Sequence, residues 1–169
     1  MLSATEPAPP VQPSAAPTTR CLILACGNPL RGDDGVGPHL AEWAEEHFRD
    51  NNEIRVLARH QFTPELAAEI SSAESVLFLD SSINSEPGRV SLIAIGPLTS
   101  HQPATHHLSA SQLLALARSL YGAYPAHAML ISIGAASIEL GTALSAPVQS
   151  ALPRAQGLLV KAVEKFLEP

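Results

Sequence analysis

The sequence predicts a single α/β domain, a three-layer αβα sandwich in which helices cover both faces of a twisted, mostly parallel sheet of five strands. Short apolar runs alternate along the chain with segments that have helical spacing of apolar residues, and this order is typical of such sheets. Hydrophobic residues form 46% of the 169 residues and charged residues only 15%. That composition favours a buried core over disorder.

The domain is expected to cover residues 20–169. Residues 1–19 consist mainly of Pro, Ala, Ser and Thr and offer little apolar surface to bury. We therefore predict a disordered N-terminal tail in front of the domain.

The first half of the domain is expected to contain three strands and two helices. Its apolar runs have the length of buried strands, and Thr63-Pro64 is typical of an N-cap followed by proline in the first helical turn. The expected elements are a strand at 21–26, a helix from Val36 to Phe48, a strand at 54–58, a helix from 64 to about 71, and a strand at 75–80.

The second half is expected to contain two strands and two helices. The strand at 89–95 alternates apolar and polar residues, as an edge strand does. Ser109-x-x-Gln112 is typical of a capping box, and Gly122 should end the helix that follows. A strand at 128–134 and a helix from about 147 to 167 complete the domain, and we expect Pro153 to kink this helix or end its first segment.

Charge and cysteine content exclude several classes of protein. The net charge of -6 and the scattered basic residues disfavour a nucleic-acid partner. No apolar run has the length of a membrane span, and no secretory signal is visible, so we expect a cytoplasmic protein with no membrane partner. Cys21 and Cys26 fall in one predicted strand on opposite faces, so they cannot pair, and two buried thiols suit a reducing compartment.

Polar side chains collect where the predicted strands end. Asp33 and Asp34 follow the first strand, Asp80 ends the third, and His106 lies in the connection after the fourth. Ligands of open α/β sheets bind outside the carboxyl ends of the strands, and His127 is set aside because it precedes its strand. Carboxylate and imidazole ligands without thiolate suit Ni²⁺, Zn²⁺ or Mn²⁺, so a divalent-metal site is predicted.

Each of these residues also has a structural interpretation. Asp33 or Asp34 is expected to cap the following helix, Asp80 could accept a structural hydrogen bond, and His106 could simply be solvated. Phosphate binding at this glycine-rich loop is disfavoured because two aspartates occupy the helix N-terminus.

Three separated segments together resemble one family. GNPLRGDDGVG at 27–37 is similar to the signature loop of the [NiFe] hydrogenase maturation endopeptidases. The segments HHLSASQLLALARSLYG at 106–122 and SIELGTALSAPVQSALPRA at 137–155 resemble later parts of the same family, in the same order. The resemblance covers the chain from about Cys21 to its end.

The resemblance implies an αβα endopeptidase that removes a C-terminal extension from the large-subunit precursor of a [NiFe] hydrogenase after nickel insertion. The precursor presents the nickel, which serves as the recognition element, so the protease need not hold a metal at rest. The implied nickel ligands and catalytic residues are Asp34, Asp80 and His106. His106 is preferred over His107 because it has the sequence spacing to Leu108 and Leu114 that the family shows. The implied partner is this precursor, and we expect the protease to be a monomer.

One loop departs from the family pattern. Many members have Asp-Gly-Gly or Asp-Cys-Gly after the second strand, whereas this chain has Arg59 to Leu66 with the sequence RHQFTPEL. His60 and Gln61 could contact substrate or serve packing and helix entry.

Covalent catalysis is disfavoured because the cysteines are expected to be buried. Two other functions are considered: a non-catalytic nickel metallochaperone or assembly factor, and a nucleotide-binding module, which the paired aspartates disfavour.

Overall fold

The computed structural model describes residues 19–98, 108–141 and 143–169, which form one five-stranded sheet covered by helices. Because parallel neighbours need crossover connections, helices follow most strands along the chain. The strands are β1 (Thr19–Cys26), β2 (Ile54–Arg59), β3 (Ala73–Ser82), β4 (Val90–Ala94) and β5 (His127–Gly134). The helices are the short 3-10 helix η1 (Gly32–Gly35), α1 (Val36–His47), α2 (Leu66–Ser71), α3 (Ala110–Tyr121) and α4 (Ala146–Leu167).

The strand order is β2-β1-β3-β5-β4, and only β4 runs antiparallel to its neighbour. In the centre of the sheet, Ile23 of β1 pairs with Val56 of β2 and Leu77 of β3. The predicted fold class is therefore confirmed, and β4 lies at an edge as its alternating sequence indicated.

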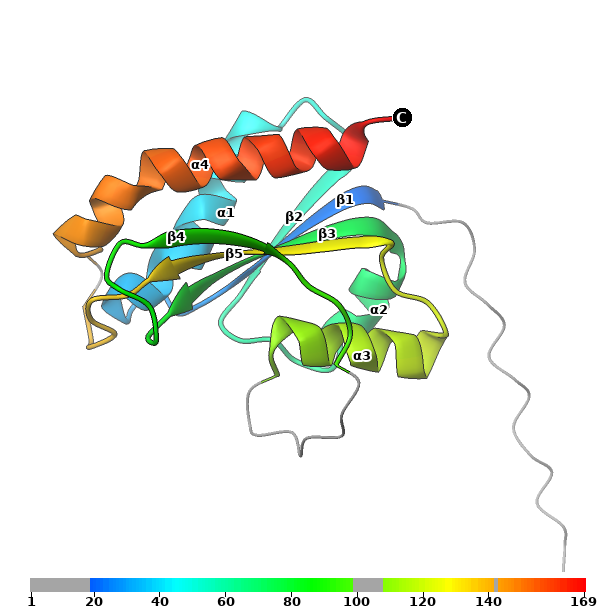
Figure 1. The fold of residues 1–169 in the computed structure, drawn as a ribbon, viewed down its shortest axis with the longest axis horizontal. Helices are drawn as coiled ribbons and strands as arrows, with labels where there is room; N and C mark the ends of the chain where they lie inside the picture. Colours follow the sequence, from blue (N-terminus) through cyan, green and yellow to red (C-terminus); the bar gives the residue numbers. More distant parts are fainter. Residues whose placement is uncertain (1–18, 99–107, 142) are drawn as a thin grey trace, which may run out of the picture.

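Helices cover both faces of the sheet (Figure 1), and two hydrophobic clusters, one on each face, hold them there. Successive strand residues point to opposite faces, so Ile23 contributes to the cluster under α1 and α4 while Leu22 contributes to the cluster over α2 and α3. Each fully buried side chain of this size stabilises the fold by roughly 1.5–3 kcal/mol. This two-sided burial explains why the runs 21–26 and 75–80 are almost continuously apolar.

The predicted ends of α3 are confirmed. The Ser109 hydroxyl accepts a hydrogen bond from the Gln112 amide at 3.2 Å, and the Gln112 side chain accepts one from the Ser109 amide at 2.8 Å. These two bonds form the capping box. Gly122 follows the helix with a φ of 66°, a conformation that glycine adopts without steric cost.

The start of α2 differs from the prediction, and of the two effects expected of Pro153 the structure excludes the end of a helix segment. Thr63 does not cap α2, because residues 63–65 form a turn in which the Leu66 amide donates to the Thr63 carbonyl at 3.1 Å, and the helix begins only at Leu66. Pro153 does not end α4, which continues from Ala146 to Leu167. The hydrogen bond that proline cannot donate is offset by burial of one face of the helix, including Ala155 and Leu159. No helix of the described segments is long and apolar enough to cross a membrane.

Candidate active site

Asp34 and Asp80 line the same cavity, which lies at the end of the sheet where the parallel strands have their carboxyl ends and which is called the carboxyl edge below. The parallel strands β1, β3 and β5 end at this edge (Figure 1), so the loop after β1 and the end of β3 meet there. The cavity has a volume of about 470 Å³ and is also lined by Cys26, Arg31 and His60. The expected convergence of the first and third loops is therefore observed.

Two hydrogen bonds hold the Asp34 carboxylate, one from the loop after β1 and one from β3. One carboxylate oxygen accepts from the Asn28 amide at 2.8 Å, and the other accepts from the Ser81 hydroxyl at 2.9 Å. The loop doubles back so closely that a Cβ atom at Gly27, whose φ is 141°, would overlap the Asp34 carbonyl. Glycine is therefore required at this position for Asp34 to face the cavity.

The Asp80 carboxyl group has a pKa well above that of an ordinary aspartate. Burial raises the pKa of Asp80 to about 6, the hydrogen bond from the Ser81 amide (2.8 Å) lowers it, and the nearby charge of Asp34 raises it further. Ser81 thus contacts both carboxylates, through its hydroxyl and its amide. Two crowded carboxylates repel each other, and a bound cation relieves that repulsion.

Asp33, next to Asp34 in the sequence, has a different role. Its side chain is 1% exposed and accepts hydrogen bonds from the amides of Ala136 (2.7 Å), Ser137 (3.1 Å) and Ser145 (2.7 Å) and from the Ser145 hydroxyl (2.8 Å). Burial alone would raise the pKa of Asp33, but these hydrogen bonds outweigh it and lower the pKa. Asp33 therefore fastens the loop after β5 to the loop after β1.

The expectation that one of the two aspartates caps the following helix is wrong. No N-cap side chain accepts a hydrogen bond from a backbone amide of η1 or α1, and the N-cap of α1 is Gly35. The Asp33 carboxylate instead accepts from the loop after β5, and the Asp34 carboxylate accepts from the Asn28 amide of its own loop and from the Ser81 hydroxyl of β3.

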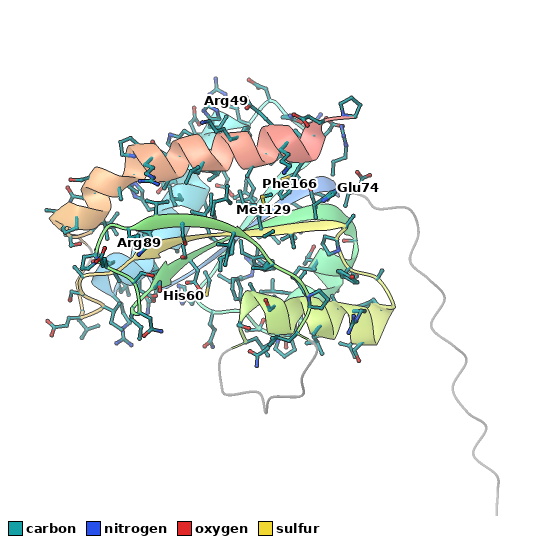
Figure 2. The ribbon with its side chains drawn as sticks, in the orientation of Figure 1. Arg49, His60, Glu74, Arg89, Met129 and Phe166 are labelled. Carbon is teal, nitrogen blue, oxygen red and sulfur yellow. The ribbon has the colours of Figure 1, made fainter. Side chains whose placement is uncertain are left out.

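His106 and its neighbour His107 lie outside the described residues, so the third member of the predicted set stays a prediction. His127 was correctly set aside. It begins β5, at the opposite edge of the sheet, and its ring stacks on that of Phe166 with centroids 6.4 Å apart. In Figure 2, Phe166 and Glu74 lie at one end of the sheet and His60 at the other.

Cys26 and His60 belong to the cavity, which sequence reasoning only partly anticipated. Cys21 is buried as expected, but Cys26, the last residue of β1, is half-buried and lines the cavity. Burial and the charges of Asp80 and Asp34 raise the pKa of the Cys26 thiol to about 12. The thiol therefore stays protonated at neutral pH, and this disfavours covalent catalysis for a different reason from the expected complete burial.

The loop after β2, which differs from the family pattern, contains residues for both roles that were expected of it: substrate contact and packing. His60 and Gln61 line the cavity, so they can contact a bound substrate. Phe62 takes the packing role instead, because it is buried and its ring meets that of Phe78 edge-on at 5.4 Å.

A complete metal site is not formed by the described residues alone. Within residues 19–98, 108–141 and 143–169, no three side chains of His, Cys, Asp or Glu are grouped as metal ligands. The cavity offers two carboxylates, and oxygen ligands suit borderline and hard divalent ions that obtain further ligands from another molecule or segment.

Solved structures of known proteins resemble the whole domain, although no family model and no curated protein matches the sequence. The hydrogenase maturating endopeptidase HybD from E. coli superposes with a TM-score of 0.71 at 18% identity, covering 87% of this chain and 93% of that one. A hydrogenase 2 maturation peptidase from a Thaumarchaeota archaeon gives 0.63 at 25% identity, with coverage of 86% and 98%. The [NiFe] hydrogenase maturation protease HybD from Thermococcus kodakarensis gives 0.61 at 25%, with coverage of 85% and 99%.

Proposed function

We propose that this chain, which has the fold of the [NiFe] hydrogenase maturation proteases as its sequence indicated, is an endopeptidase that processes a hydrogenase precursor. In this proposal it removes the C-terminal extension of the large subunit once nickel has been inserted, and the nickel is the recognition element. The observation that carries the proposal is the meeting of Asp34 and Asp80 in one open cavity at the carboxyl edge of the sheet.

The two carboxylates suit an ion that arrives with the substrate. An ion held by the precursor already has ligands, and Asp34 and Asp80 can add oxygen ligands to it. The cation would displace the proton that Asp80 binds with a pKa of about 6, because a positive charge favours the carboxylate. Recognition would therefore be tightest above that pH.

His106 is proposed as the third ligand. Its support in the structure is indirect: Leu108, two positions further along the chain, lines the cavity. An imidazole nitrogen beside two carboxylate oxygens is a suitable set for Ni²⁺.

Docking through nickel would hold the scissile peptide against the cavity, and fixed geometry alone can lower a reaction barrier by several kcal/mol. In the reaction, water adds its hydroxyl to the peptide carbonyl carbon and its proton to the leaving amine. The ion can polarise that carbonyl or activate the water, and both routes agree with the cavity.

The proposal is tested by intact mass spectrometry of the cognate precursor, nickel-loaded or nickel-free, after incubation with the protein. The wild-type chain should remove a C-terminal peptide only from the loaded precursor, and Asp34→Asn should abolish that loss. Asp50→Asn is a matched control because Asp50 is exposed beyond the end of α1. Unchanged cleavage by the Asp34 variant would contradict the assignment. Tight nickel binding by the isolated chain, without cleavage of a loaded precursor, would instead support a metallochaperone.

A further inference from the structure

Two exposed leucines lie close in the chain to residues that line the cavity. Leu30 is 59% exposed and Leu140 is 89% exposed. Arg31, next to Leu30, and Ile138, two positions before Leu140, line the cavity itself. Leu30, Arg31, Ile138 and Leu140 are called the rim below.

The rim is held in place by hydrogen bonds between two loops that are more than a hundred residues apart in the sequence. The Gly141 amide donates to the Leu30 carbonyl at 2.9 Å, and the Gly32 amide donates to the Gly141 carbonyl at 2.7 Å. The Arg31 guanidinium adds a bond from its Nε atom to the Ile138 carbonyl at 3.1 Å. The leucines are therefore presented to solvent by a braced backbone.

Asp33 strengthens this bracing from beneath. Its carboxylate binds the amides of Ala136 and Ser137, where the second loop begins, and its own amide donates to the Ser137 carbonyl at 3.0 Å. Preorganised apolar side chains bind a partner with a smaller entropy cost than mobile ones. An isolated exposed leucine is ordinary, but two held beside the cavity that is proposed to receive the scissile peptide indicate a contact surface.

We propose that the rim is the docking surface for the hydrogenase precursor and binds an apolar segment next to the scissile bond. This inference rests on the proposed function. The precursor is the occupant that fits because the rim is continuous with the cavity: Arg31 and Ile138 belong to both. The leucines would lose water on docking, while the Arg31 nitrogens other than Nε can donate to carbonyl groups of the bound chain.

The test uses the full-length protein and the nickel-loaded precursor. Leu30→Ser with Leu140→Ser, and Leu140→Ser alone, are compared with Leu120→Ser, a leucine 52% exposed near the end of α3 that does not line the cavity. Loss of apolar contact should raise KM for the double variant roughly tenfold or more and change kcat little. The Leu120 variant should match the wild type.

The outcomes separate this inference from the proposed function. If the wild-type chain cleaves and the Leu140 variants, folded by circular dichroism, retain the wild-type KM, the rim does not bind the precursor. If the loss lies in kcat with KM unchanged, the docking role is likewise overturned. Absence of cleavage by the wild-type chain contradicts the proposed function itself, whatever the rim variants do.

Discussion

Replacing Asp80 by Asn should stabilise the protein at neutral pH while abolishing its activity. The carboxyl pKa is about 6 in the folded protein, against an ordinary value of 3.8. A difference of about 2 in pKa corresponds to about 3 kcal/mol. At pH 7 the buried charge of Asp80 therefore lowers the free energy of unfolding by this amount. Asparagine carries no charge and keeps an oxygen that can accept the bond from the Ser81 amide.

The sign of the effect depends on pH. Between about pH 4 and pH 6 the folded state holds a proton on Asp80 that the unfolded state releases, so wild-type stability from this group falls as pH rises. Below about pH 4 both states are protonated and the penalty disappears. The Asn variant should therefore exceed the wild type by roughly 1–3 kcal/mol at pH 7, and the advantage should vanish near pH 4.

Urea unfolding at pH 4, 5, 6 and 7 measures this difference directly, because all other groups are shared by the two proteins. At pH 7 the melting temperature should rise by roughly 3–10 °C. A variant that is no more stable than the wild type at pH 7, or whose extra stability is the same at every pH, would show that the charge of Asp80 does not destabilise the fold. Loss of precursor cleavage in the same variant would show that the charge that costs stability is needed for function.

The remaining predictions concern the groups around this carboxyl. Ser81→Ala removes the 2.9 Å bond to Asp34 and should weaken binding of the nickel-loaded precursor, seen as a higher KM, at a stability cost of about 1 kcal/mol. Asp33→Asn leaves amides of the loop after β5 without an acceptor and should cost roughly 2–4 kcal/mol in urea unfolding; a neutral result would refute its bracing role. Gly37→Ala places a Cβ atom against the Cys26 carbonyl, 3.0 Å from that of Leu79, and should lower the yield of folded protein in circular dichroism. Native Cys26 should react with iodoacetamide at pH 8 far more slowly than the same thiol in the urea-unfolded chain, because its pKa is about 12, and equal rates by mass spectrometry would contradict this.

The fold followed from local patterns in the sequence. Apolar runs of strand length, amphipathic helices and the capping box at Ser109 are properties of neighbouring residues, so they could be interpreted one segment at a time. The alternation of strands and helices then restricted the sheet to a mostly parallel one. An error fell where a local signal competed with packing, at Thr63 before α2, and at Pro153 the helix continued.

The sequence by itself also determined which loops could form a site, because parallel strands end at one edge, and so it brought Asp34 and Asp80 together. Residue chemistry and spacing did not decide which of the two adjacent aspartates faces the cavity, and only the family resemblance indicated Asp34. That choice depends on donors at Ala136, Ser137 and Ser145, more than a hundred residues along the chain, which occupy Asp33. The two aspartates have the same intrinsic chemistry, and only tertiary contacts distinguish the one that braces the loops from the one that lines the cavity.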